Sequence, residues 1–197
     1  MLRLRLFRSF GSLVGALLIA SCADPALQSL TAPVNAAADH GGDSGSGSLQ
    51  LHALWWNQEY QSQIKVSKVI DKAGGRISIP QTGFTMVIPA GALSGPLTIT
   101  VTADTRYVAY KMDPAGTQFK ADVTVTQSLS NTTVGGEPLS NQLYAAYIAD
   151  DSTKLSGSIS VTEIEPSKTI FSSTNPLLPV AQVWIIRHFS RYMLASG

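Results

Sequence analysis

Two stretches, Thr98-Ile99-Thr100-Val101-Thr102 and Val123-Thr124-Val125-Thr126, place an apolar residue at every second position. Successive side chains of a β-strand point to opposite faces, so this period of two is typical of a strand with one buried face and one exposed face. Threonine, valine and isoleucine also favour strands because their branched side chains pack well on a pleated surface. These two stretches predict β-structure around them.

The same pattern continues on either side, from residue 64 to the end of the chain. Turn signals rich in glycine and proline, such as Gly74-Gly75, Gly95-Pro96 and Gly135-Gly136, separate the runs. No stretch has the period of a convincing amphipathic helix. Many short strands at this spacing favour an all-β fold, an antiparallel β-sandwich or a related barrel. The strands are expected at residues 64–70, 76–79, 84–88, 97–102, 107–111, 121–129, 142–149, 158–164, 168–171, 181–187 and 191–195.

Before this region, residues 22–60 are interpreted as a tether. Residues 40–48 are almost entirely glycine and serine apart from His40 and Asp43, a composition that cannot bury a core. The pair Trp55-Trp56 interrupts this composition, and we interpret it as a segment that docks against the edge of the domain. His40 and His52 have no further ligands at suitable spacing, so no metal site is expected. The domain itself is expected over residues 61–197.

The first 21 residues are typical of a bacterial export signal. Arg3, Arg5 and Arg8 precede an uncharged apolar run over residues 10–20, which is shorter than the roughly 20 residues that a transmembrane helix needs. The sequence Ile19-Ala20-Ser21-Cys22 then resembles the lipobox of bacterial lipoproteins, whose cysteine is acylated and becomes the new N-terminus. Cys22 is the only cysteine of the chain. We therefore expect a lipid anchor at Cys22 that holds the domain at the cell envelope, periplasmic or surface-exposed, without spanning the membrane.

Charge and cysteine content exclude several classes of protein. The chain has 14 Lys+Arg and 13 Asp+Glu, and without the three arginines of the signal 11 basic and 13 acidic residues remain, a net charge of −2. That balance gives no footprint for nucleic acid. A single cysteine excludes a disulfide-stapled domain. The sequence offers no cofactor motif and no motif for turnover of an external substrate.

Three motifs in a fixed order resemble the ZU-five domain of zonula occludens, uncoordinated-five and ankyrin proteins. They are Gly74-Gly75-Arg76-Ile77-Ser78-Ile79-Pro80, the turn Ile88-Pro89-Ala90-Gly91-Ala92 that ends the following strand, and the block Asp113-Pro114-Ala115-Gly116-Thr117-Gln118-Phe119. The resemblance covers about residues 64 to 195. It implies a β-sandwich that serves as a structural or interaction domain with a protein partner that the sequence does not identify.

The resemblance also directs attention to His188-Phe189-Ser190, because some members of the family cut themselves between Phe and Ser of such a motif. It implies that Ser190 attacks the carbonyl of Phe189 to form an ester, while His188 moves the proton. The attacked peptide would need strain and backbone donors for its oxyanion. In contrast to the self-cleaving members, which continue into a further domain, only residues 190–197 follow this bond. If residues 191–195 form a paired strand, the cut peptide stays bound.

Three functions therefore stand side by side: a lipid-anchored interaction module, a self-processing domain, and a surface that binds carbohydrate through aromatic side chains. The third is weakened by strand parity. Tyr107 and Tyr110, like Tyr144 and Tyr147, are three residues apart and face opposite sides of a strand. Asp150-Asp151-Ser152 has no further acids at calcium-loop spacing and is interpreted as a hairpin turn.

Overall fold

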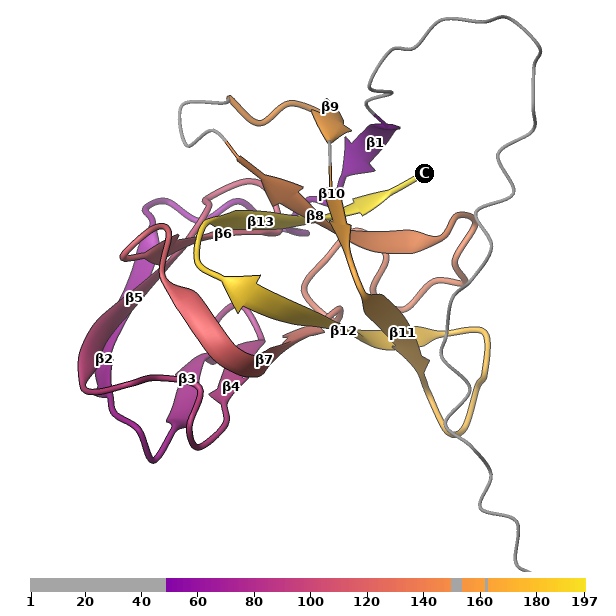
Figure 1. Ribbon diagram of the computed structural model, residues 1–197. Coiled ribbons are helices and arrows are strands. Elements are labelled where there is room, and N and C mark those ends of the chain that lie inside the picture. Colours follow the sequence, from indigo (N-terminus) through magenta and orange to yellow (C-terminus); the bar gives the residue numbers. More distant parts are fainter. Residues whose placement is uncertain (1–48, 150–153, 162) are drawn as a thin grey trace, which may run out of the picture. The chain divides into compact units, whose positions relative to one another are not determined.

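The computed structural model describes residues 49–149, 154–161 and 163–197, and these form two antiparallel sheets that pack as a sandwich (Figure 1). The all-β fold class predicted from the sequence is confirmed. The first sheet has the order β10 (Glu163–Glu165), β8 (Leu143–Ile148), β13 (Arg191–Ser196), β6 (Ala109–Asp113), β5 (Leu97–Ala103) and β2 (Ile64–Ile70). The second has the order β11 (Ser167–Phe171), β12 (Pro179–His188), β7 (Gln118–Ser128), β4 (Phe84–Ile88) and β3 (Gly75–Ile79).

The main core lies between the two sheets and follows the period of two. In β5, Ile99 and Val101 are fully buried while the alternating threonines are partly exposed, and in β7 Val123 and Val125 are fully buried. Trp184 of β12 joins the same apolar cluster. Removing these side chains from water supplies the main driving force for closing the sandwich.

The first sheet also contains a two-stranded extension that lies off this order of strands. It consists of β1 (Leu49–Ala53), which pairs with both β13 and β9 (Ser158–Val161). Leu51, Ile159 and Val161 pack there on Ala146 and Met193 of the first sheet and form a second apolar cluster. Figure 1 shows β1 and β9 lying over β8 and β13. The strand β13 is thus buried on both faces.

The start of the domain differs from the sequence-based expectation. The sandwich begins with β1 at Leu49 rather than at residue 61, so the last part of the expected tether is structured. Trp56 is 4% exposed, and its indole N–H donates to the backbone carbonyl of Asp104 at 2.9 Å. The docking interpretation of the tryptophan pair is therefore confirmed for Trp56, which enters the main core.

Most expected strands differ from the observed ones by one to three residues at an end, and two differ in a way that has an identifiable reason. The strand expected at 107–111 is displaced to Ala109–Asp113, because the carboxylate of Asp104 accepts hydrogen bonds from the backbone N–H groups of Arg106 and Tyr107 and holds them in a turn. The strand expected at 158–164 is two strands, since β9 pairs with β1 whereas β10 pairs with β8.

The first two family motifs contact one another. Gly74 has a φ of 77°, and a side-chain carbon at this position would lie 2.3 Å from the carbonyl oxygen of Ile88. The N–H of Gly91, in the turn after β4, donates to the carbonyl of Lys72 at 2.8 Å. The close approach of these two turns explains why glycine is needed at Gly74.

The described residues contain no helix that is long and apolar enough to cross a membrane. The expected signal segment, the lipidation site Cys22 and the expected turn at Asp150-Asp151-Ser152 lie outside the described residues.

Candidate functional site

The His188-Phe189-Ser190 segment joins β12 of the second sheet to β13 of the first sheet. The pairing of β12 with β7 becomes irregular between Ile186 and His188. Such irregularities bend a strand and re-aim its side chains, and they are common beside functional sites. The segment therefore lies at a crossing between the two layers of the sandwich.

Phe189 is fixed by packing and by two backbone hydrogen bonds. Its ring is 1% exposed and lies edge-on to Phe119, with ring centres 4.7 Å apart. Its N–H donates to Thr117 at 2.8 Å, and its carbonyl accepts from the N–H of Gly116 at 3.0 Å. A backbone donor on this carbonyl is the kind of group that stabilises an oxyanion.

Ser190 is held by neighbouring strands of the first sheet. Its hydroxyl donates to the backbone carbonyl of Ile148 at 3.2 Å, and its own carbonyl accepts from the N–H of Met112 at 2.9 Å. Within the described part of the chain, no hydrogen bond joins the Ser190 hydroxyl to the imidazole of His188. The carbonyl of Phe189 thus has a backbone donor. The hydroxyl of Ser190, the expected nucleophile, and the imidazole of His188, the expected base, contact different groups.

The imidazole of His188 contacts two tyrosines of the first sheet. The Tyr192 hydroxyl donates to the backbone carbonyl of His188 at 2.7 Å and lies 3.3 Å from the Nδ1 atom of the same residue. The ring of Tyr147 lies edge-on to the imidazole, with the two ring centres 5.0 Å apart. The Tyr192 proton is donated to the carbonyl, so in the tautomer that carries its proton on Nδ1 the Tyr192 oxygen accepts from Nδ1–H and Nε2 keeps a lone pair.

Two carboxylates of β10 lie beside this imidazole. Glu163 and Glu165 are two residues apart and share one face of the strand, and their carboxylate oxygens lie within 4.8 Å of each other and of a ring nitrogen of His188. The sequence analysis missed this cluster. The Glu-x-Glu spacing on an expected strand was the one signal for this cluster in the sequence. The fold is needed to bring His188 close to the two glutamates.

Burial changes the acidity of this cluster. Glu165 is 8% exposed, and burial together with the nearby Glu163 raises the pKa of its carboxyl to about 7, although Arg187 acts in the opposite direction. Burial also raises the pKa of Tyr192, and the nearby Glu165, Tyr147 and Glu163 add to that effect. The guanidinium of Arg187 binds the exposed carboxylate of Asp122 at 2.9 Å, which raises the pKa of Arg187.

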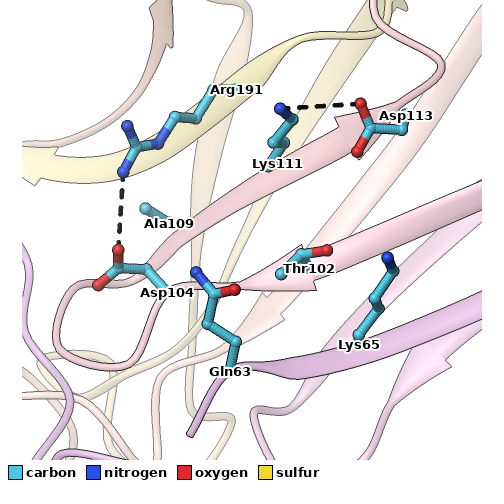
Figure 2. A pocket seen from close by; sticks show the side chains of 8 residues that line it. All are labelled: Gln63, Lys65, Thr102, Asp104, Ala109, Lys111, Asp113 and Arg191. Atoms are coloured by element: carbon cyan, nitrogen blue, oxygen red, sulfur yellow. Dashed lines mark ion pairs between the residues drawn. The ribbon is translucent and has the colours of Figure 1, made fainter. Parts of the chain in front are cut away.

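A separate polar hollow of about 330 Å³ lies on the outer face of the first sheet (Figure 2). Lys65, Thr102, Lys111 and Arg191 occupy successive register positions on β2, β5, β6 and β13 and so form one row across the hollow. Two acids border the row. Asp104 lies 3.6 Å from Arg191, and Asp113 lies 3.9 Å from Lys111.

The tyrosine pairs considered for carbohydrate binding lie on opposite sides of the first sheet, by strand parity for Tyr144 and Tyr147 in β8, while Tyr107 lies in the turn before β6. Tyr107 and Tyr144 pack on the outer apolar cluster, whereas Tyr110 and Tyr147 pack on the main core. Trp56 and Tyr110 are 4% and 1% exposed and offer no face to a sugar. Arg106 places its guanidinium 4.3 Å from the centre of the Trp55 ring.

The comparison with protein families covers the first two glycine and proline motifs and the third as far as Gln118. Residues 66–118 match the model of the ZU5 domain. The predicted resemblance to this family is thereby confirmed over these residues, which run from β2 to the first residue of β7, and it stays a prediction for the remainder of residues 64–195. A ZU5 domain indicates a structural or interaction domain. His188-Phe189-Ser190, Glu163 and Glu165 lie beyond the matched residues. No curated protein matches the chain.

Proposed function

We propose that this chain is a lipid-anchored interaction module of the bacterial cell envelope. The order of basic, apolar and small residues before Cys22 supports export and acylation. Acyl chains on that cysteine would hold the ZU5 domain at a membrane surface.

The row of Lys65, Lys111 and Arg191 in the hollow is the observation that carries the proposed interaction. Among the described residues, three cations and two acids line the hollow, and these side chains carry a net charge of +1 although the chain without its signal is acidic overall. We assign this surface to a protein partner that contributes carboxylate groups. Charge complementarity of this kind favours the encounter and fixes the orientation of two proteins.

The anchor is tested by fractionating bacterial cells that express the full chain with labelled palmitate. Wild type is expected in the membrane fraction with label attached. Cys22→Ser should lose the label and leave the membrane fraction, whereas Ser21→Ala, which retains a small residue before the cysteine, should behave as wild type. Labelling that persists in Cys22→Ser would overturn the anchor.

The docking surface is tested by placing a photo-crosslinking amino acid at Thr102, within the hollow, or at Val87, on β4 of the other sheet. A discrete crosslinked product is expected only from Thr102. Adding Lys65→Glu should abolish that product, because it reverses one charge of the row. Products of equal yield from both positions, or a Thr102 product that is insensitive to Lys65→Glu, would contradict the assignment.

Self-cleavage between Phe189 and Ser190 is a second candidate, supported by the hydrogen bond from Gly116 N–H to the Phe189 carbonyl. In this reaction the Ser190 oxygen bonds to the carbonyl carbon of Phe189, the C–N bond breaks, and the amine of Ser190 takes the proton. Water then hydrolyses the ester. His188 would have to turn from Tyr192 toward the Ser190 hydroxyl to move the proton.

The intact mass of the purified chain under denaturing conditions tests this candidate. Cleavage predicts a wild-type mass that lacks residues 190–197 and a Ser190→Ala mass that contains them. Equal masses that both contain these residues would assign His188-Phe189-Ser190 a purely structural role. The result does not depend on the partner, so the two candidates are tested separately.

A further inference from the structure

The cluster of Glu163, Glu165 and His188 lies where the chain crosses twice between the sheets. Pro166 links β10 of the first sheet directly to β11 of the second, and its carbonyl accepts from the N–H of Ile185 in β12. His188 ends β12 shortly before the second crossing. Figure 1 shows β10 running from the first sheet toward β11. The three side chains therefore come from different sheets and meet at the open side of the sandwich.

Glu165 has no hydrogen-bond partner among the described residues, but its carboxylate oxygens are not wholly buried, and Arg187 acts on it as a counter-charge. It is 8% exposed, and the single ion pair of the neighbouring Arg187 is to Asp122 within that part of the chain. Burying an ionised carboxylate is costly unless a counter-charge or hydrogen bonds offset the loss of water. A second acid, Glu163, lies within 4.8 Å of Glu165 and makes the cost larger. A cation at this point would offset the charge of both carboxylates.

The donor set identifies the class of cation. Calcium and magnesium prefer oxygen ligands alone, whereas zinc accepts imidazole nitrogen together with carboxylate oxygen. Ligand atoms of a tetrahedral zinc ion at about 2.1 Å from the metal lie roughly 3.4 Å apart. The donor atoms here lie within 4.8 Å of one another, so side-chain rotations alone can bring them to that spacing.

We propose that Glu163, Glu165 and His188 bind one divalent transition-metal ion of the zinc class. Nε2 of His188 is the ligand nitrogen, because the Tyr192 hydroxyl holds Nδ1. A hydrogen bond of this kind to the second ring nitrogen orients the imidazole for the metal. The ion joins β10 of the first sheet to β12 of the second and stabilises the sandwich at its crossing points. Three protein ligands leave a fourth position for water or a partner's side chain.

Calorimetric titration of the tag-free full chain with ZnCl₂, after removal of metals with EDTA, tests the proposal. One equivalent of Zn²⁺ is expected to bind. At a free concentration about 100 times the Kd, the Tm should rise by roughly 5–10 °C. Glu163→Gln and Glu165→Gln should each lose the high-affinity site, while Glu137→Gln, an exposed glutamate elsewhere, should bind as wild type. Circular dichroism confirms that the variants fold.

Two further arms separate this site from unrelated histidines. The titration is repeated in a His40→Ala/His52→Ala background, where binding should persist, and with His188→Asn added, where it should be lost. Mg²⁺ should give no binding heat and no shift in Tm. Absence of Zn²⁺ binding to the wild type overturns the proposal. Zn²⁺ binding that survives Glu165→Gln or His188→Asn also overturns it.

Discussion

At the residue scale, Gly74 shows how one backbone position fixes the contact between two turns. Its φ of 77° lies in the left-handed region, and the space that a side chain would need is filled by the backbone of Ile88, Pro89 and Ala90. Gly91 has a similar φ of 81° but has nothing within 4 Å of the position of a side-chain carbon. Both glycines have a left-handed backbone conformation, but only Gly91 has room for a side-chain carbon.

We therefore predict different costs for the same substitution at these positions. Gly91→Ala should lower the free energy of unfolding by about 1 kcal/mol, the cost of a left-handed alanine. Gly74→Ala should lower it by about 3 kcal/mol or more, because the turn after β4 must also move. Urea denaturation of both variants measures the difference. Equal costs would show that backbone strain alone decides.

Tyr110 is a second residue whose environment has a measurable consequence. Its ring is 1% exposed, and its hydroxyl donates to the side-chain carbonyl of Gln127. The side-chain amide nitrogen of Gln127 donates in turn to the backbone carbonyls of Thr82 and Ser128. Burial raises the pKa of Tyr110, and it also raises that of Tyr192. Both phenols are therefore more easily ionised in the unfolded chain than in the folded chain.

This difference predicts a loss of stability in base. The folded pKa lies above the unfolded value of about 10, so the stabilisation is fully present below pH 10 and is lost as the pH rises further. Near-ultraviolet absorbance should show two of the six tyrosines ionising only together with the loss of the circular dichroism signal. Ionisation of all six before that loss would contradict the prediction.

At the scale of single elements, local patterns predicted strands well where apolar and polar residues alternate along the strand. The strands at residues 64–70 and 84–88 have the predicted bounds, and Gly83 and Pro89 delimit the second of them. β1 was missed because its apolar positions, Leu51 and Ala53, follow a Gly/Ser-rich stretch and are buried only by β9 and the first sheet. Contacts between segments more than 100 residues apart leave no local signal.

The role of β1 predicts the effect of removing one side chain. Leu51 is 1% exposed in the outer apolar cluster, whereas the adjacent His52 is exposed. Leu51→Ala should lower the free energy of unfolding by about 2–5 kcal/mol, the usual cost of a cavity in a packed cluster. His52→Ala should change it by less than about 0.5 kcal/mol. Chemical denaturation of the two variants measures this contrast, and a neutral Leu51→Ala would show that β1 does not stabilise the sandwich.

At the scale of the whole molecule, the sequence predicted the fold class and the position of His188-Phe189-Ser190 near a strand end, but not the neighbours of that segment. The order of strands in a sheet depends on which strand edges pair with each other, and no local sequence pattern determines this pairing. The row of Lys65, Lys111 and Arg191 is spread over more than 120 residues and exists only through the register of four strands. The meeting of Glu163 and Glu165 with His188 likewise requires both sheets.

The central position of β13 gives the last prediction. β13 pairs with β8 and with both β6 and β1, and it buries Tyr192 and Leu194 on one face and Met193 and Ala195 on the other. A chain that ends at Phe189 should therefore show no cooperative thermal unfolding, because two strand edges and two apolar clusters lose a shared partner.

Adding a synthetic peptide of residues 190–197 to that truncated chain should restore a cooperative transition that depends on peptide concentration. The same peptide with Leu194→Asp should not, since it would bury an unpaired charge in the main core. A truncated chain that unfolds at the wild-type temperature without peptide would contradict the central role of β13. Restoration by the peptide would also mean that a chain cut after Phe189 keeps its last strand under native conditions, so that cleavage alters the covalent chain without opening the sandwich.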